Sequence, residues 1–239
     1  MNVEALARTL ADAAAGATAV PQLSLAHDLG IDDAYAVQRL VVDARKRPRT
    51  GVKLGLTSRA KAEQMGVSDV IVGELTEDMA VADGGRVPSD RFIHPRVEPE
   101  VAFLVRGDRI TAVAPALEII DSRYRDFHFN LVDVIADNAS AAAYVLGPWR
   151  PAGTDTANHG VVLEIDGRVA VSGSTAAILG DPRRAVDTAA RLARTTRLRM
   201  PEETVVLAGA ATAAVPLTPG STVEARVSAL GRVSFTYGT

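Results

Sequence analysis

The chain has 239 residues, of which 47% are hydrophobic and 23% are charged, and it contains no cysteine. This composition predicts a packed globular core, and it excludes disulfides, thiolate nucleophiles, iron–sulfur clusters and zinc sites built on cysteine. The net charge of −3 and the aromatic content of 4% argue against a nucleic-acid surface. No apolar run approaches the roughly 20 residues of a membrane helix, and the charged residues within 1–16 are not typical of a signal peptide. We therefore expect a cytoplasmic protein with no nucleic-acid or membrane partner.

Two amphipathic helices are expected in the first 49 residues. Apolar residues recur at intervals of three and four between residues 3 and 14, which predicts a helix with one apolar face. A second helix is expected to begin at Asp32 or Asp33, whose carboxylates can cap free backbone amides, and to end before Pro48. Its predicted buried stripe consists of Ala34, Val37, Leu40, Val41 and Ala44.

Short apolar runs typical of β-strands dominate the chain from residue 52 onward. One or two helical turns are expected at 58–65 and a late helix at 182–198, and Asp166 and Gly167 between two runs predict a hairpin turn. We therefore expect an α+β protein with a mostly β core and a single domain over residues 1–239. Within it, an N-terminal helical segment (1–49) precedes a β-rich catalytic core (50–239).

Two glutamates at the start of an apolar run form the first candidate site. Glu98 and Glu100 are two residues apart, and in a strand their side chains therefore point to the same side. Neighbouring carboxylates repel each other, and unpaired charge is costly next to an apolar strand. A bound Mg²⁺ or Mn²⁺ would resolve both problems, because hard cations take oxygen ligands. The alternative is a solvated strand edge at which Arg96 neutralises one glutamate.

Two further charged residues lie alone in apolar runs. Glu118 is either a third oxygen ligand or half of a buried ion pair with an arginine such as Arg123. Lys53 lies in a predicted strand between two glycines, where burial would suit it to acid–base work or to holding a carboxylate. The alternative for Lys53 is a side chain that extends to solvent from the edge of a sheet.

A fourth group of polar residues lies at 133–140. Asp137, Asn138 and Ser140 have apolar neighbours, and their side chains could bind a substrate or stabilise a turn. The four histidines show no ligand spacing among themselves, and the sequence has no phosphate loop, nucleophile elbow or zinc motif. A metal site is therefore expected to rest on carboxylates.

Together, these segments resemble the fumarylacetoacetate hydrolase superfamily, and within it the branch of 2-oxopent-4-enoate hydratases and 4-oxalocrotonate decarboxylases. The resemblance spans nearly the whole chain and is most specific at residues 53–66, 93–103, 115–140 and 209–216. The segments 120–124 and 211–216, together with Phe127, resemble the decarboxylases more than the hydratases. The resemblance implies the β-roll core of this superfamily, with N-terminal helices and one late helix.

The resemblance also implies the residues of the site. The family's metal ligands fall on Glu98, Glu100 and Glu118, which would hold Mg²⁺, with Mn²⁺ as an alternative. The family's active-site lysine falls on Lys53, and an acidic residue with a catalytic role falls on Asp78. The substrate-binding positions are expected at Leu54, Gly55, Ser58, Asn138, Ser140 and Thr212.

The implied reaction is the metal-dependent decarboxylation of 2-oxo-3-hexenedioate to 2-oxopent-4-enoate in the meta-cleavage catabolism of aromatic hydrocarbons. The alternatives are hydration of 2-hydroxypentadienoate, hydrolysis of a carbon–carbon bond in an acylpyruvate, and a catalytically silent partner subunit. The resemblance further implies a homo-oligomer and, for a decarboxylase, association with a hydratase of the same family.

One departure from the family pattern concerns the connection between the glutamates. Relatives usually place a helix between the Glu-x-Glu strand and the segment of the third glutamate, whereas here only residues 101–114 lie between them. Glu118 must then return to Glu98 and Glu100 through a short connection near 106–108, which predicts a β-hairpin. The missing helix bears on oligomer contacts and on activity, and it is the main support for a silent subunit.

Overall fold

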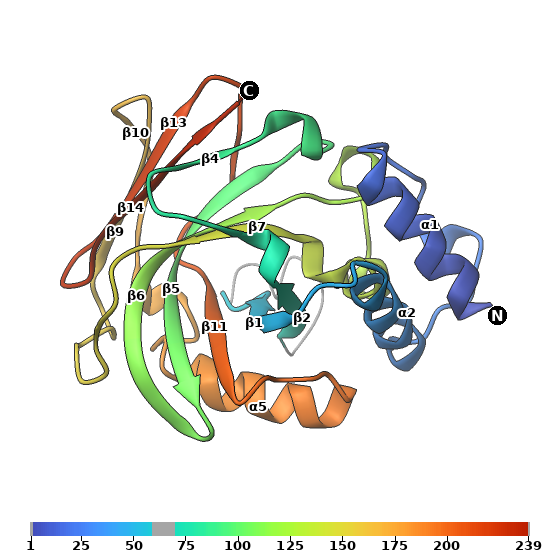
Figure 1. The fold of residues 1–239 in the computed structure, drawn as a ribbon, viewed down its shortest axis with the longest axis horizontal. Helices are drawn as coiled ribbons and strands as arrows, with labels where there is room; N and C mark the ends of the chain where they lie inside the picture. Colours follow the sequence, from blue (N-terminus) through green and yellow to red (C-terminus); the bar gives the residue numbers. More distant parts are fainter. Residues whose placement is uncertain (1, 59–69, 239) are drawn as a thin grey trace.

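The computed structural model describes residues 2–58 and 70–238, and it contains two β-sheets with helices packed around the larger one (Figure 1). The larger sheet has the strand order β2-β1-β11-β5-β6-β7-β3, with β12 paired to β5 and β8 paired to β6. Its strands are β1 (Arg49–Gly55), β2 (Ile71–Thr76), β3 (Ala80–Val81), β5 (Arg96–Arg106), β6 (Arg109–Ile120), β7 (Ala141–Leu146), β8 (Arg150–Pro151), β11 (Glu203–Ala210) and β12 (Val215–Pro216). The expected α+β fold with a mostly β core is confirmed.

The smaller sheet packs against one face of the larger sheet and has the order β10-β9-β13-β14-β4. Its strands are β4 (Gly85–Val87), β9 (Gly160–Ile165), β10 (Arg168–Ser174), β13 (Thr222–Val227) and β14 (Gly231–Tyr237). Val97 and Leu117 of the larger sheet share an apolar core with Phe235 of the smaller sheet. Because side chains alternate along a strand, Glu98 and Glu118 point to the opposite face of the larger sheet.

Four α-helices pack around the larger sheet in the described part of the chain: α1 (Val3–Ala15), α2 (Ile31–Ala44), α4 (Leu131–Ala136) and α5 (Arg184–Thr196). Helix α5 lies against β11 and α1 packs on α2 (Figure 1). Helix α2 also packs on α4. The buried amide of Gln38 on α2 donates hydrogen bonds to the backbone oxygens of Val72 on β2 and Ile135 on α4, at 2.9 and 3.0 Å. One polar side chain thus ties the N-terminal helices to the sheet.

The buried face of α2 differs from the predicted stripe. Leu40 is 37% exposed and Ala44 is also exposed, whereas Tyr35 and Val42 are buried. The prediction was therefore wrong for Leu40 and Ala44 and omitted Tyr35 and Val42, because α2 contacts both α1 and α4 and its buried surface is set by both neighbours. The other predicted elements are confirmed where the structure describes them, but the turns expected at 58–65 lie outside the described residues from residue 59 onward.

Strands β5 and β6 form one long hairpin that closes at Gly107, whose φ angle is 61°. In its register Glu98 is the direct partner of Glu118, and Arg96 is the direct partner of Ile120. The short connection predicted near 106–108 is therefore confirmed. It brings the third glutamate back to the first two without an intervening helix.

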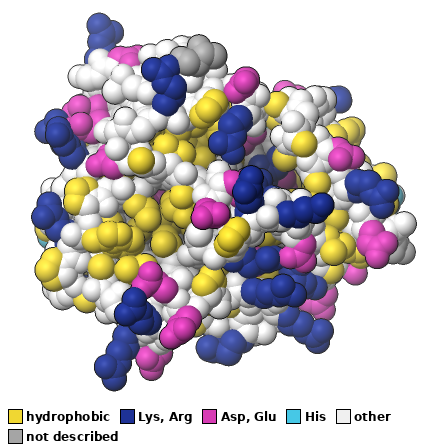
Figure 2. All heavy atoms as spheres, in the orientation of Figure 1, with side chains coloured by type: hydrophobic (Ala, Val, Ile, Leu, Met, Phe, Trp, Pro, Cys, Tyr) yellow, Lys and Arg dark blue, Asp and Glu magenta, His cyan; other side chains and the backbone are white. Residues whose placement is uncertain are grey.

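The outer surface carries charges of both signs. On the face seen in Figure 2, basic and acidic side chains are interspersed, and apolar side chains lie exposed between them. None of the described helices combines the length and the apolar character needed to span a membrane.

Gly51 allows β1 and β11 to pair in parallel. A Cβ atom at this residue would lie 2.0 Å from the backbone oxygen of Val205, its register partner. We predict that Gly51→Ala lowers the free energy of unfolding by about 1–3 kcal/mol, because the two strands must move apart. Chemical denaturation measures this loss. Gly153→Ala is the matched control, since nothing lies within 4 Å of a Cβ atom there, and an equal loss in both variants would contradict the prediction.

Candidate metal centre and active site

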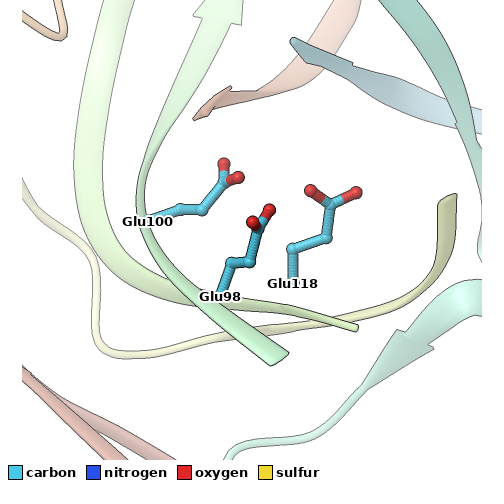
Figure 3. A group of neighbouring side chains, drawn as sticks. All are labelled: Glu98, Glu100 and Glu118. Carbon is cyan, nitrogen blue, oxygen red and sulfur yellow. The ribbon is translucent and has the colours of Figure 1, made fainter. Parts of the chain in front are cut away.

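Three glutamate side chains meet on the face of the larger sheet that points away from the smaller sheet. Glu98 and Glu118 face each other across the β5–β6 hairpin, and Glu100 lies two residues further along β5. Each offers one carboxylate oxygen, and these oxygens lie within 4.8 Å of one another (Figure 3). The exposed fractions of Glu98, Glu100 and Glu118 are 5%, 1% and 1%. The three carboxylates therefore share one buried space.

Lys53 projects from β1 into the same space. Its Nζ lies 3.0 Å from Glu118 Oε2, and it donates a hydrogen bond of 3.0 Å to the backbone oxygen of Ala139. Burial alone would lower the pKa of Lys53, but the three nearby carboxylates, Glu118 most strongly, outweigh burial and raise it above its ordinary value. Because β1 lies between β2 and β11, Lys53 is a buried ammonium in the interior of the sheet and not a lysine at its edge.

Burial and neighbouring negative charge disfavour the charged states of Glu100 and Glu118. Burial raises the pKa of Glu100 well above its ordinary value, and the negative charge of Glu118 raises it further. Burial also raises the pKa of Glu118, although Lys53 acts in the opposite direction. The backbone N–H of Gly209 donates to Glu100 Oε2 at 2.9 Å, but Glu100 Oε1 and Glu118 Oε1 accept no hydrogen bond from the described residues. Buried oxygens of this kind call for a further positive charge.

A divalent cation fits this arrangement. Three carboxylate oxygens this close together match the preference of Mg²⁺ and Mn²⁺ for hard oxygen ligands. The ammonium of Lys53 carries a single positive charge and pairs with Glu118 Oε2, so among the described residues it leaves Glu100 Oε1 and Glu118 Oε1 without a hydrogen-bond partner. The cluster contains neither histidine nor cysteine, which disfavours zinc. Glu98, Glu100 and Glu118 are therefore candidate metal ligands.

A cavity of about 620 Å³ opens beside the three glutamates. Lys53 and Glu98 line it at the candidate metal centre, and Arg96 and His128 contribute two further basic side chains. Its other walls are mainly apolar and are formed by Gly55, Leu56, Ile71, Ile120, Phe127, Phe129, Val134, Ala139, Ala213 and Ala214, with the polar Gln22 and Ser140. A small organic acid with a hydrocarbon chain fits this combination of basic groups and apolar walls.

Three consecutive residues in the left-handed backbone conformation form one wall of the site. Asn138, Ala139 and Ser140 have φ angles of 53°, 51° and 58°. The side-chain amide of Asn138 exchanges two hydrogen bonds with the backbone of Glu74, which holds the turn against β2. The turn presents the Ala139 oxygen to Lys53 and places Ser140 on the cavity wall, where its buried hydroxyl has no hydrogen-bond partner among the described residues. Asn138 thus stabilises the turn, whereas Ser140 faces the site.

The remaining predicted substrate-binding residues differ in their distance from the cavity. Gly55 lies on its wall, whereas the side chain of Leu54 belongs to the apolar core on the other face of β1. Thr212 lies next to Ala213, a cavity residue, and its hydroxyl donates to the Ala213 backbone oxygen. Ser58 is half-buried and is not among the described residues of the cavity wall. A direct role in binding is therefore favoured for Gly55 and stays a prediction for the others.

Asp78 lies outside this cavity. Its carboxylate forms an ion pair with Arg45 at 2.5 Å and accepts a hydrogen bond from Thr76, and it lines a separate hollow of about 420 Å³. Burial alone would raise the pKa of Asp78, but hydrogen bonds from Thr76 and Arg45 lower it below its ordinary value. An ionised carboxylate paired in this way anchors the end of α2 to the segment after β2. The geometry therefore gives no support to the predicted catalytic role of Asp78.

Two alternatives that the sequence left open are decided by the positions of arginines. Arg123 forms its ion pair with the buried Asp137, so it does not compensate Glu118. Arg96 forms no ion pair with any described residue, and its guanidinium lies 4.2 Å from the centre of the Phe127 ring. Neither arginine therefore neutralises the three glutamates.

Several cavity residues were not predicted. Arg96 could have been identified as a site residue, because it precedes Glu98 by two positions and therefore shares its strand face. Residues 127–129 and Gln22 come from irregular connections that reach the cavity only in the folded chain. No periodic signal in the sequence marks such residues.

A family model described as the C-terminal part of fumarylacetoacetate hydrolase matches residues 79–236, a range that includes the three glutamates. The chain is also 46% identical to a 4-oxalocrotonate decarboxylase from a Pseudomonas species, over 98% of both chains. The chain belongs to the fumarylacetoacetate hydrolase family. Within this family it is also 36% identical to a 2-keto-4-pentenoate hydratase from Paraburkholderia xenovorans, and that match covers 86% of this chain and 83% of the hydratase.

Solved structures of the family share this fold. The structure of 4-oxalocrotonate decarboxylase from Pseudomonas putida G7, complexed with magnesium and adipate, matches this chain with a TM-score of 0.92. The two chains are 34% identical, and the match covers 98% of this chain and 97% of that chain. A second structure of that enzyme, complexed with calcium and acetate, has the same TM-score. The predicted fold of the fumarylacetoacetate hydrolase type is thereby confirmed.

Mg²⁺ is expected to stabilise the protein through the three glutamates. A ligand at 100 times its dissociation constant stabilises the fold that binds it by about 2.7 kcal/mol. Glu100→Gln removes one ligand and one repelling charge. The metal-free variant is therefore expected to be at least as stable as the wild type, while most of the Mg²⁺-induced rise in Tm is lost.

Thermal melting with Mg²⁺ and with EDTA measures both effects. Glu203→Gln is the control, because Glu203 is an exposed glutamate paired with Arg106, and this variant should keep the full rise. A Glu100→Gln variant with the wild-type rise in Tm would contradict the metal assignment.

Metal binding is expected to weaken at acidic pH. The pKa values of Glu100 and Glu118 are raised in the metal-free protein, so both carboxylates take up protons as the pH falls through these raised values. A metal ion must displace those protons, and the affinity for Mg²⁺ should therefore increase with pH across this range. Calorimetry in buffers of different ionisation enthalpy measures the affinity and the protons released. A pH-independent affinity without proton release is the outcome that this prediction forbids.

Proposed function

We propose that the protein is a metal-dependent lyase that decarboxylates 2-oxo-3-hexenedioate to 2-oxopent-4-enoate in the meta-cleavage catabolism of aromatic compounds. The proposed metal is Mg²⁺, with Mn²⁺ as an alternative. The proposal depends above all on one observation, the buried cluster of Glu98, Glu100, Glu118 and Lys53 beside an apolar cavity. Two relatives named 4-oxalocrotonate decarboxylase, 46% and 38% identical to this chain, support the choice of reaction.

The proposed reaction needs an acceptor for an electron pair. The bond between C5 and C6 of the substrate breaks, C6 leaves as CO₂, and the electron pair moves through the C3–C4 double bond to the keto oxygen on C2. When it is bound by the three glutamates, Mg²⁺ supplies a Lewis acid for this oxygen. The ammonium of Lys53 adds a fixed positive charge in the same space. The resulting dienolate takes up one proton to give the product.

Lys53 is also placed to move that proton. Its Nζ is held by the Glu118 carboxylate and by the Ala139 backbone oxygen, which leaves one N–H of the ammonium for a substrate atom. The surrounding carboxylates favour the protonated form by raising the pKa of Lys53. Lys53 therefore acts as a proton donor or electrostatic stabiliser and not as a base in the resting state.

Apolar walls surround the place where the conjugated chain of the substrate would lie. Leu56, Ile71, Val134 and Phe129 are among the apolar residues that line this part of the cavity. Walls of this kind exclude water, which strengthens electrostatic interactions with the developing charge and limits the addition of water to the alkene. The apolar walls are therefore consistent with the proposed loss of CO₂, which adds no water to the substrate.

Hydration of 2-hydroxypentadienoate is the second candidate function. It is supported by the hydratase relative at 36% identity and by His128, an imidazole on the cavity wall that could activate water. The two functions are distinguished by incubating the Mg²⁺-loaded protein with 2-oxo-3-hexenedioate and measuring CO₂. Release of CO₂ supports decarboxylation as the function. If no CO₂ is released and the protein hydrates 2-hydroxypentadienoate, hydration becomes the assigned function instead.

A catalytically silent partner subunit receives less support. The short β5–β6 hairpin still places Glu118 opposite Glu98, so the missing family helix gives no reason to expect a defective site. We include a homo-oligomer and association with a hydratase of the same family in the proposal. Light scattering of the purified chain, alone and mixed with such a hydratase, tests both.

Lys53→Met is expected to lower kcat for CO₂ release by roughly 10²–10⁴-fold, because it removes the proton donor and its charge. Binding of Mg²⁺ should be retained or strengthened, since a cation that competes for the glutamates is gone. A coupled CO₂ assay and calorimetry measure the two quantities. Lys46→Met, at an exposed lysine, is the control with wild-type activity. Loss of Mg²⁺ binding in Lys53→Met would instead give Lys53 a structural role.

A further inference from the structure

We propose that Arg96 binds the distal carboxylate of the substrate and makes the cavity selective for 2-oxo dicarboxylates over 2-oxo monocarboxylates. The inference rests on the proposed function in one respect, namely that the 2-oxo acid end of the substrate binds at the three glutamates. It identifies a specificity-determining residue for the proposed dicarboxylate substrate that the metal centre alone does not determine.

The position of Arg96 follows from the alternation of side chains along β5. Arg96, Glu98 and Glu100 lie at every second residue and therefore share one strand face. A strand rises about 3.3 Å per residue, so the backbones of Arg96 and Glu98 are roughly 6.6 Å apart. Arg96 and Glu98 both line the cavity, as does Ile120, which pairs with Arg96 in the hairpin. The guanidinium thus lies one step along the strand from the candidate metal ligands.

The guanidinium of Arg96 is held in place but forms no ion pair with the residues that the structure describes. It lies 4.2 Å from the centre of the Phe127 ring, and that ring packs against His94 with 4.6 Å between the ring centres. No described residue forms a hydrogen bond or an ion pair with this guanidinium, although other buried or half-buried arginines such as Arg49 and Arg123 are paired with carboxylates. Stacking on an aromatic ring occupies the flat face of the guanidinium and leaves its N–H groups available.

The segment that holds Phe127 is conformationally strained. Asp126 and Phe127 have φ angles of 58° and 56°, a left-handed region that non-glycine residues rarely adopt. Such strain persists only where the surrounding structure enforces it, and it is concentrated at ligand-binding sites. Here the strain places an aromatic ring beneath an unpaired guanidinium on the wall of the cavity.

A carboxylate is the ligand that fits this group. A guanidinium offers parallel N–H donors that match the two oxygens of a carboxylate, and such charge-assisted pairs are strong and directional. A substrate that carries one carboxylate at the metal and a second at the other end of a short apolar chain would satisfy both the glutamate cluster and Arg96. The product has lost the distal carboxylate and therefore cannot form the ion pair with Arg96. The loss of this ion pair would favour release of the product. The monocarboxylate substrate of a hydratase would leave Arg96 without a partner.

The experiment compares two unreactive analogues, 2-oxoadipate and 2-oxohexanoate, which have the same chain length and differ in the distal carboxylate. Their binding to the Mg²⁺-loaded protein is measured by calorimetry, with oxalate as a probe of the metal end alone. We expect the wild type to prefer 2-oxoadipate by roughly 10- to 100-fold. Arg96→Gln should abolish this preference while oxalate binding stays unchanged. Arg96→Lys should keep part of the preference, because a lysine retains the charge without the paired donors.

Arg91→Gln is the matched control, because Arg91 also lies over an aromatic ring, that of Phe92, but outside this cavity. This variant should keep the full preference. An unchanged preference in Arg96→Gln would overturn the proposal. Loss of oxalate binding in both Arg96 variants would also overturn it, because Arg96 would then be needed for the folding of the site. A wild type that releases no CO₂ but shows the Arg96-dependent preference would reject the proposed decarboxylation and leave this inference standing.

Discussion

Repulsion between buried carboxylates is the constraint around which the site is built. Glu98 and Glu118 face each other across an antiparallel ladder, where like charges are destabilising, and Glu100 adds a third negative charge with an exposed fraction of 1%. Lys53 and the backbone N–H of Gly209 offset part of this cost. The remainder is a reason for the site to hold a divalent cation. In the proposed reaction, this cation accepts electron density from the substrate, so the reaction depends on the buried carboxylates that would hold it.

The order of the larger sheet makes this cluster possible. Strands β1, β11, β5 and β6 are consecutive neighbours, so Lys53, Gly209 and the glutamates approach one another although they are far apart in sequence. Gly209 is suited to its place, because its φ angle is 109° and a Cβ atom there would lie 2.1 Å from Thr57 Oγ1. Close strand contacts, rather than loops alone, thus hold the charged groups in position. The loops contribute the cavity walls and, we propose, substrate selectivity.

Much of the candidate site could be predicted because strands alternate. The two-residue spacing of Glu98 and Glu100 places both side chains on one face of a strand, whatever the order of strands in the sheet. Glu118 is the lone charged residue in an apolar run of the sequence, which indicates a compensating partner in the fold. Only the family resemblance implies a catalytic role for Asp78, and strand alternation gives no information about it. A carboxylate close in sequence to a strand looks much the same whether it faces a substrate or, as here, pairs with Arg45 at the end of a helix. Only the packing of α2 distinguishes these two cases.

The sequence by itself determined the fold class, the family resemblance, the hairpin between the glutamates and the shared strand face of Glu98 and Glu100, because these depend on local periodicity and on short-range motifs. It left open whether a hard cation or an ion pair compensates the glutamates. The tertiary structure alone decided that Lys53 pairs with Glu118, that Arg123 pairs with Asp137, and that residues 127–129 line the cavity. Arg123 and Asp137 are 14 residues apart, and Lys53 and Glu118 are 65 residues apart. No periodicity in the chain encodes which of these distant segments meet. The physical reason is that partner choice depends on the order of strands in the sheet, which is settled by the packing of the whole core.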